Sequence, residues 1–240
     1  QGPLDPLADP SKHSLSVFSK ALLASLDRAI DRINAGYEGF RFNEIAQALY
    51  DFVWGDFCDR FIEVAKADFA SGADAARRAG TLATIDHTLR RVLQLLHPYA
   101  PFMTEELWHG LGFGACSIQF SGWPEPSAAR DEKALAFAAD FHEAASMARN
   151  LRAGYRLPSN KKLDWLIEAP AAGVEKELGV LALLLNASSL TVHTGPAPKG
   201  AAVVLTPIGK IYLPVEGVVD VAAERARLEA EVAKVEVEIA

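Results

Sequence analysis

The sequence predicts a mainly α protein: an antiparallel helical bundle, followed by a small α+β domain and the start of a coiled-coil helix. Three observations support this fold class. Apolar residues recur every three or four positions through most of residues 15–96. Short β-like runs bounded by turn residues follow residue 160. A heptad-like apolar seam then runs from Asp220 towards the end.

Composition limits the class of protein. The chain has 240 residues, of which 50% are hydrophobic and 23% are charged, which is typical of a globular protein of one large or two small domains. No window approaches the roughly 20 apolar residues that span a bilayer. The 24 basic and 31 acidic residues give a net charge of -7. Any binding of nucleic acid must therefore be local.

The first two helices are predicted from the helical period. One helix starts at Pro10 and Ser11 and ends at Gly36 and Gly39, and a second runs over residues 41–69. Their apolar stripes are, in order, Leu15, Phe18, Leu22, Leu26 and Ile30, then Ile45, Leu49, Phe52, Val53, Phe57, Phe61 and Val64.

Two further helices complete the predicted bundle. A third stripe runs from Leu82 to Leu96 and stops before Pro98. A short helix through Leu111 is capped by Thr104. Because each of the three longer helices has one apolar face, we expect an antiparallel bundle over residues 1–112.

Residues 113–130 are rich in glycine and proline around Trp123 and are predicted to link the bundle to a second domain. That domain, residues 131–218, is predicted as a small α+β junction domain. Its expected elements are helices at 131–152 and 174–185, and strands at 163–168, 189–193, 202–206 and 210–214. Pro207 to Gly209 supply the turn between the last two strands.

Residues 219–240 are predicted as a truncated coiled-coil arm, because apolar residues fall at heptad spacing in a segment too short to be stable alone. The chain starts at Gln1 without a methionine and ends at Ala240 without a glycine stop or a proline. We therefore expect a piece of a longer polypeptide.

No catalytic or metal site is predicted. Cys58 and Cys116 form no CxxC pair, and we expect both to be thiols. The histidines have no mutual ligand spacing. The string of Gly110, Gly112 and Gly114 follows a helix, so a helix stop is favoured over a phosphate cradle.

A local cluster of cations is the most informative feature of the sequence. Between residues 149 and 162 there are five basic residues and no acidic one, and Tyr155 adds a flat ring on which a base can stack. The basic residues are Arg149, Arg152, Arg156, Lys161 and Lys162. The three arginines are spaced to share one side of a helix end. The segment predicts a contact with nucleic acid, and the alternative is a solvated helix end.

A second candidate surface lies at the start of the long helix, where Phe40, Arg41, Phe42 and Asn43 place two rings beside a cation and an amide. Such a set can stack on unpaired bases. From the sequence alone, the favoured interpretation is that both rings are core anchors. The nearby row of Asp51, Asp56 and Asp59 is interpreted as helix surface and interhelical polar contacts.

Four stretches carry a resemblance to a known family. Arg41 to Lys66, "RFNEIAQALYDFVWGDFCDRFIEVAK", and Leu95 to Trp108, "LLHPYAPFMTEELW", resemble the anticodon-binding domain of class I aminoacyl-tRNA synthetases of the valine, isoleucine and leucine group. Ala148 to Lys162 and Ile211 to Ala240 resemble the valyl-tRNA synthetase family in particular. The resemblance covers most of the chain. It departs at Arg60 and Phe61, which replace a pair of aromatics, and over residues 1–14.

The resemblance implies a C-terminal fragment that binds valine tRNA in the cytoplasm. The family's HIGH and KMSKS strings and its editing domain lie upstream, so the parent would be an ATP-dependent valine-tRNA ligase and a monomer, whereas the fragment would be inactive and hold no cofactor. The tRNA-binding residues expected are Phe40, Arg41, Asn43, Arg149, Arg152, Tyr155, Arg156, Lys161 and Lys162. The alternatives are a structural or protein-interaction module, and the equivalent domain of an isoleucyl- or leucyl-tRNA synthetase.

Overall fold

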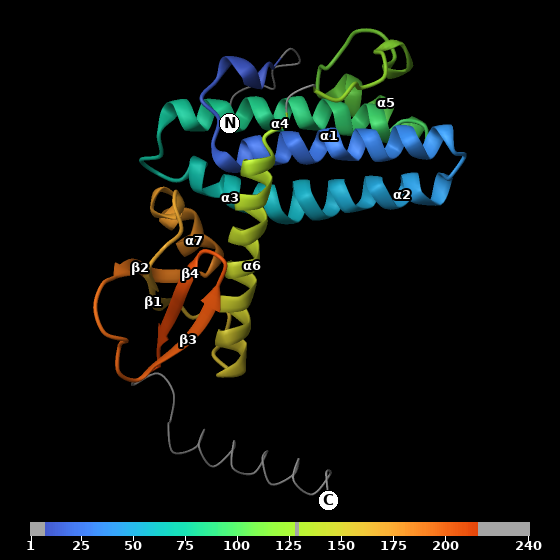
Figure 1. Ribbon diagram of the computed structural model, residues 1–240. Helices are drawn as coiled ribbons and strands as arrows, with labels where there is room; N and C mark the ends of the chain where they lie inside the picture. Colours follow the sequence, from blue (N-terminus) through green and yellow to red (C-terminus); the bar gives the residue numbers. More distant parts are fainter. Residues whose placement is uncertain (1–7, 128–129, 216–240) are drawn as a thin grey trace, which may run out of the picture. The chain divides into compact units, whose positions relative to one another are not determined.

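The structure, a computed structural model, describes residues 8–127 and 130–215 (Figure 1). It divides into two compact units, with the division between Ala139 and Asp140. The described part of the first unit is helical, and that of the second contains a four-stranded sheet. The prediction of a mainly α protein with a small α+β part is confirmed. The predicted arm lies outside the described residues.

Three long helical segments form the first unit. Helix α1 (Val17–Glu38) packs against both α2 (Phe42–Tyr50) and α4 (Ala75–Leu96), and α5 (Pro101–Gly110) packs on α4 (Figure 1). Ile30 and Ile45 of the predicted stripes are fully buried, as is Ile33 outside them, and of the predicted third stripe only Val92 and Leu93 are buried, beside Leu95. Burial of these side chains is the main stabilising term of the bundle.

The predicted start of the first helix was seven residues too early. Pro10 belongs to a separate 3-10 turn, η1 (Pro10–Lys12), whose first turn is capped by Asp9. Helix α1 begins only at Val17, because the hydroxyl of Ser16 accepts the backbone N–H of Ser19, at 3.0 Å. A serine hydroxyl that accepts the backbone N–H three residues later therefore determines the helix start here, and the proline upstream does not.

The predicted long helix over residues 41–69 is continuous but not uniform. After α2 it widens into the π-helical segment η2 (Asp51–Phe61), and then continues as α3 (Ile62–Ala65) and the 3-10 segment η3 (Lys66–Phe69). The apolar stripe stays buried through the change, with Phe52, Phe57 and Phe61 in the core.

Helix α5 also begins earlier than predicted. Pro101 occupies its first turn, and Thr104 is a buried residue inside the helix instead of its cap. The Thr104 hydroxyl donates to the carbonyl of Ala100, at 2.9 Å. The helix ends at Gly110, and Gly112 has a φ of 74°, so the interpretation of the glycine string as a helix stop is confirmed.

The segment predicted as a linker packs on the bundle. Ile118, in the 3-10 turn η4 (Ile118–Phe120), lies in a buried cluster with Leu93, Trp108 and Phe113. The indole N–H of Trp123 donates to Asn34, and the backbone N–H of Ser127 donates to Asp27. The first unit therefore extends past the predicted limit at residue 112.

The second unit holds the sheet. Its strands are β1 (Leu163–Glu168), β2 (Ala187–His193), β3 (Ala201–Thr206) and β4 (Gly209–Pro214), in the order β2-β1-β4-β3. Strands β1 and β2 are parallel and are joined through the 3-10 turn η5 (Val174–Glu177) and helix α7 (Leu178–Leu184), whereas β3 and β4 form the predicted hairpin. All four predicted strands are present, to within two residues at each end.

Candidate nucleic-acid interface

The turn between α1 and α2 projects two rings from the bundle. It is tight because Gly36 lies against Ile45 and the backbone N–H of Arg41 donates to the carbonyl of Gly36, at 2.8 Å. Phe40 is 80% exposed and Phe42 is 54% exposed. The interpretation of both rings as core anchors was wrong, because the core positions here are filled by Ile33 and Ile45.

Arg41 and Asn43 lie at this same turn. The guanidinium of Arg41 is held by the carbonyl of Ala35, at 3.2 Å, and by the carboxylate of Glu44, at 3.0 Å. Half of the Arg41 side chain stays exposed, and Asn43 is exposed at the start of α2. The rings, the cation and the amide predicted from the sequence are therefore brought together at the surface.

The structure brings further rings to this turn that the sequence analysis did not assign to it. The Tyr99 hydroxyl, in the turn between α4 and α5, donates to the carbonyl of Phe42 at 3.4 Å, and Phe102, the second residue of α5, is 91% exposed. Tyr37 makes edge contacts with both Phe42 and Trp123. We call the exposed rings of Phe40, Phe42, Tyr99 and Trp123 the ring surface. The turn between α1 and α2, the turn between α4 and α5, and the segment after α5 contribute to it, and only the proline-bounded "HPYAPF" stretch hinted at an exposed turn.

Helix α6 (Glu132–Gly154) ends beside α7 in the second unit, and there the predicted basic residues separate into two groups. Arg152 is 5% exposed, and its guanidinium donates to the carbonyls of Leu185, Pro158 and Lys161. Arg149 is exposed and donates to the carbonyl of Leu184. Arg152 is therefore unavailable as a surface contact, and its prediction as a tRNA ligand conflicts with its burial.

Beyond the end of α6, Arg156, Lys161 and Lys162 are exposed and Tyr155 is half-buried. Arg156 lies outside the helix, with a φ of 52°, so the three arginines do not share one helix side as predicted. Within the described part of the chain, no carboxylate pairs with these three cations. We call residues 155–162 the basic loop. Its charge is free to attract an anion.

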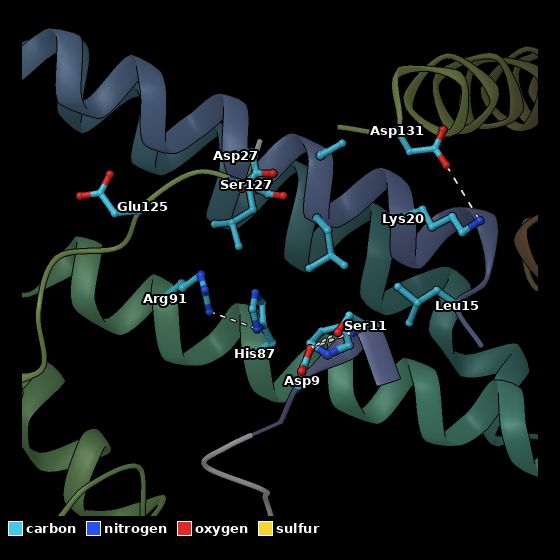
Figure 2. Close-up of a pocket in the computed structure, with 14 residues that line it drawn as sticks. Asp9, Ser11, Leu15, Lys20, Asp27, His87, Arg91, Glu125, Ser127 and Asp131 are labelled. Atoms are coloured by element: carbon cyan, nitrogen blue, oxygen red, sulfur yellow. Dashed lines mark hydrogen bonds and ion pairs between the residues drawn. The ribbon is translucent and has the colours of Figure 1, made fainter. Parts of the chain in front are cut away.

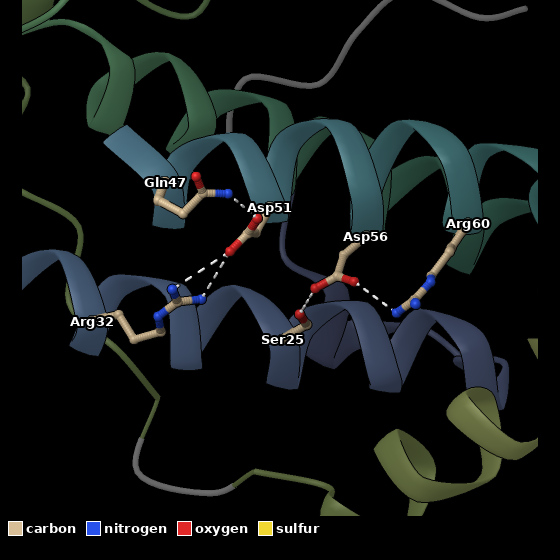
Figure 3. A network of polar contacts seen from close by, with 6 residues as sticks. All are labelled: Ser25, Arg32, Gln47, Asp51, Asp56 and Arg60. Carbon is tan, nitrogen blue, oxygen red and sulfur yellow. Dashed lines mark hydrogen bonds and ion pairs between the residues drawn. The ribbon is translucent and has the colours of Figure 1, made fainter. Parts of the chain in front are cut away.

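The acidic row of the long helix is structural. Asp51 accepts from Gln47 and pairs with Arg32, while Asp56 accepts from Ser25 and pairs with Arg60 (Figure 3). These contacts tie α1 to the long helical segment. The interpretation of the row is confirmed: Asp51 and Asp56 make interhelical polar contacts, and Asp59 lies exposed on the helix surface.

A polar cavity of about 440 Å³ lies between α1, α4 and the segment before α6 (Figure 2). Within it His87 and Arg91 are in contact, at 3.1 Å, and Asp27 accepts from Ser127. Burial, reinforced by Arg91, lowers the pKa of His87 to about 4, so its ring is neutral and accepts the Arg91 proton. Burial raises the pKa of Asp27. His87 and Arg91 therefore contact each other, whereas Asp27 is held by the backbone of Ser127.

Other classes of site receive no support from the described residues. Cys58 and Cys116 are free and exposed, which confirms the prediction of thiols. Among residues 8–127 and 130–215, no three His, Cys, Asp or Glu side chains converge as metal ligands. No helix in these ranges is both long and apolar enough to cross a membrane.

Comparison with known proteins identifies the family of this chain. Residues 19–167 match the family model described as the anticodon-binding domain of tRNA ligase. The chain is 35% identical over 237 residues to a valine–tRNA ligase of Xanthomonas euvesicatoria pv. vesicatoria, covering 92% of this chain and 24% of the relative. It is 33% identical over 226 residues to the valine–tRNA ligase of Oceanobacillus iheyensis, covering 92% and 26%.

A third relative, the valine–tRNA ligase of Bacillus thuringiensis subsp. konkukian, is 32% identical over 222 residues, covering 89% of this chain and 25% of its own length. The chain thus spans about a quarter of the length of the curated relatives it matches. The matched range contains the turn bearing Phe40 and Phe42 and the basic loop. On this match, the chain belongs to the family of anticodon-binding domains of tRNA ligases.

Proposed function

We propose that this chain binds the anticodon stem and loop of valine tRNA. The observation that carries the proposal is the ring surface: exposed rings gathered beside Arg41 and Asn43 at one end of a rigid bundle. Unstacked loop bases can lie against such rings, and an amide and a guanidinium can donate to base edges. A monomeric globular domain has no structural need for this many exposed rings in one place.

The basic loop supplies the second contact. Arg156, Lys161 and Lys162 can neutralise phosphates, which fixes the position of the RNA without reading its sequence. If three to five cations of the chain touch phosphate, the logarithmic slope of affinity against salt is roughly -2 to -3.5. This local attraction explains how a chain of net charge -7 binds a polyanion.

The proposal extends to the longer protein that the relatives represent. That longer protein is an ATP-dependent valine-tRNA ligase, whose catalysis and editing take place in domains outside this chain. The chain alone neither binds ATP nor aminoacylates. The parent acts in the cytoplasm as a monomer. The relatives' names and the quarter of their length that this chain spans support this assignment.

Binding of fluorescently labelled valine tRNA at 50 mM salt tests the proposal. We expect Phe40→Ala with Phe42→Ala to weaken binding about tenfold or more, since each base–ring stack contributes about 1–3 kcal/mol. The matched control is Trp54→Ala, which removes a 63% exposed ring from the middle of the long helical segment. It should leave the affinity unchanged.

Two further results decide between the candidate functions. Valine tRNA carrying a different anticodon should bind more weakly than the native one, and equal binding would argue against anticodon recognition. Replacing Arg156, Lys161 and Lys162 with Glu should abolish binding without changing self-association. Altered self-association with intact tRNA binding would favour a protein-interaction module.

A further inference from the structure

The end of helix α7 presents carbonyl groups that have no partner within the helix. The last four carbonyls of any helix need donors from elsewhere. Here Arg149 Nε donates to the carbonyl of Leu184, at 3.1 Å, and an Nη of Arg152 donates to the carbonyl of Leu185, at 3.2 Å. Both cations also lie at the negative end of the helix dipole. Helix α6 therefore caps α7 with two arginines one turn apart.

Arg152 does more than cap a helix. Its second Nη donates to the carbonyls of Pro158 and Lys161, so one planar group joins the basic loop to the end of α7. The side chain is 5% exposed, and burial lowers the pKa of its guanidinium. An arginine nonetheless stays protonated in proteins. Among the described residues no carboxylate pairs with it, so the carbonyl dipoles are what solvate its charge.

The basic loop folds around this guanidinium. The backbone N–H of Leu157 donates to the carbonyl of Arg152, at 3.3 Å, and that of Lys161 donates to Pro158, at 3.1 Å. From the other side, the Asn186 amide donates to the carbonyl of Ser159, at 3.0 Å. The carbonyls of the loop thus point inward to donors. Arg156, Lys161 and Lys162 are left exposed.

We propose that Arg152 is a positioning residue: it holds the basic loop in the conformation that presents Arg156, Lys161 and Lys162 to RNA phosphates, and touches no phosphate itself. The inference rests on the proposed tRNA-binding function. A guanidinium suits the task because its planar fork reaches three carbonyls at once, which the single ammonium of a lysine does not. The role differs from the phosphate contact that the sequence pattern indicated.

The salt dependence of tRNA binding distinguishes the two roles. Valine tRNA binding is measured between 50 and 200 mM salt for the wild-type chain, for Arg152→Met, and for a variant with Arg156, Lys161 and Lys162 all changed to Ala. Removing a residue that neutralises one phosphate lowers the salt slope by about 0.7, whereas removing three such residues lowers it by about 2. We expect Arg152→Met to lower the slope by about 2.

Combining the substitutions gives a second readout. We expect Arg152→Met to add little to the triple variant, because a displaced loop no longer makes the contacts that the triple variant removes. A slope change near 0.7 that adds fully to the triple variant would show direct phosphate contact and overturn the proposal. An unchanged slope would overturn it as well.

Arg152→Lys serves as the control for unfolding, because it keeps the buried positive charge while losing the planar guanidinium. We expect the lysine variant to retain the buried Trp165 fluorescence yet bind tRNA as weakly as Arg152→Met. In hydrogen exchange without RNA, its Leu157 and Lys161 amides should lose protection. Retained protection in the lysine variant would contradict the proposal.

The matched control is Arg149→Met, which removes an exposed arginine whose guanidinium caps α7 through the carbonyl of Leu184. It should change the salt slope by at most about 0.7 and leave the loop amides protected. Absence of tRNA binding by the wild-type chain at 50 mM salt would refute the proposed function itself. Binding that survives Arg152→Lys would refute only the positioning role.

Discussion

At the scale of single residues, the fold depends on a few polar side chains that are buried together with their partners. Asp68, at the end of the long helical segment, is 5% exposed and accepts from Arg77 Nε at 2.5 Å and from the Thr81 hydroxyl at 2.7 Å. Both donors belong to α4. Buried carboxylates are tolerated only with such partners, so this contact fixes where the two segments meet.

Removing the Asp68 carboxylate should therefore be costly. We expect Asp68→Ala to lower the free energy of unfolding by about 2–4 kcal/mol, because it leaves buried donors without an acceptor. Equilibrium urea unfolding measures the change. Glu63→Ala removes the exposed partner of Lys66 and should cost under about 1 kcal/mol. Equal losses in the two variants would show that burial of Asp68 is unimportant.

His87 makes stability depend on pH. Because folding lowers its pKa to about 4 from an ordinary value near 6.5, the unfolded chain binds a proton over a range in which the folded chain does not. The contribution of neutral His87 to the free energy of unfolding is therefore complete above pH 6.5 and is lost as pH falls towards 4. The loss amounts to at most roughly 3 kcal/mol.

We expect His87→Gln to flatten the dependence of unfolding free energy on pH between 6.5 and 4, since glutamine does not titrate. Urea unfolding at a series of pH values measures the slope, and His13→Gln, an exposed position, is the control. The raised pKa of Asp27 changes the free energy of unfolding with pH in the opposite direction to His87, and it does so in both the unmodified chain and His87→Gln. A slope identical to that of the unmodified chain would contradict the expectation.

Sequence patterns predicted the composition of the candidate interface but not the separate roles of its residues. The cations between residues 149 and 162 stand out by charge alone, and the sequence treats Arg149, Arg152 and Arg156 as equivalent. What separates them is the end of α7, about thirty residues further along the chain. In the same way, the exposure of Phe40 and Phe42 follows from two isoleucines already filling the core.

At the scale of elements, the sequence predicted which segments are helices or strands better than where they begin. Periodicity identified the helices of the bundle, and the strands were found because β-like runs lie between turn residues. The start at Val17 was missed because the side-chain bond of Ser16 decides it, and the start at Pro101 was missed because a proline at the first helical position begins α5 three residues before Thr104. The π-helical widening at Asp51–Phe61 leaves the apolar pattern unchanged and so gives no sequence signal.

One close approach between elements should be sensitive to a single methyl group. A Cβ on Gly80, in α4, would lie 2.4 Å from the backbone carbonyl oxygen of Ser14, which cannot rotate away. We expect Gly80→Ala to destabilise the chain by about 1–3 kcal/mol despite the better helix propensity of alanine. Thermal unfolding measures the effect.

Gly110 provides the comparison for this prediction. It ends α5, and a Cβ there would meet nothing within 4 Å. Gly110→Ala should be neutral or should stabilise by up to about 1 kcal/mol. A similar loss at both glycines would mean that the space around Gly80 does not matter.

At the scale of the whole molecule, the segment after the bundle belongs to the bundle's own core. Trp108 is 2% exposed because Phe113 and Ile118 cover it together with Leu93. Glycine and proline content identified this segment as a connection, but composition does not show whether a connection is packed. Its isolated apolar residues are too few to give a periodic signal.

A chain that ends at Gly112 should therefore be much less stable than one that ends at Ala139. We expect its melting temperature to be at least roughly 10 °C lower, since each kcal/mol shifts the midpoint of a domain of this size by about 3–5 °C. Its Trp108 emission should also move to longer wavelength. Matching melting temperatures would show that residues 113–139 add nothing to the first unit.

The backbone conformation of Phe40 affects the stability of the turn that carries the ring surface. Its φ of 51° is a left-handed conformation that a bulky side chain adopts only at a cost of about 1–2 kcal/mol. Glycine would occupy this corner more comfortably, so Phe40→Gly should raise the melting temperature relative to Phe40→Ala while both lose the same affinity for RNA. Under the proposed function, stacking of the Phe40 benzyl group on an RNA base offsets this conformational cost.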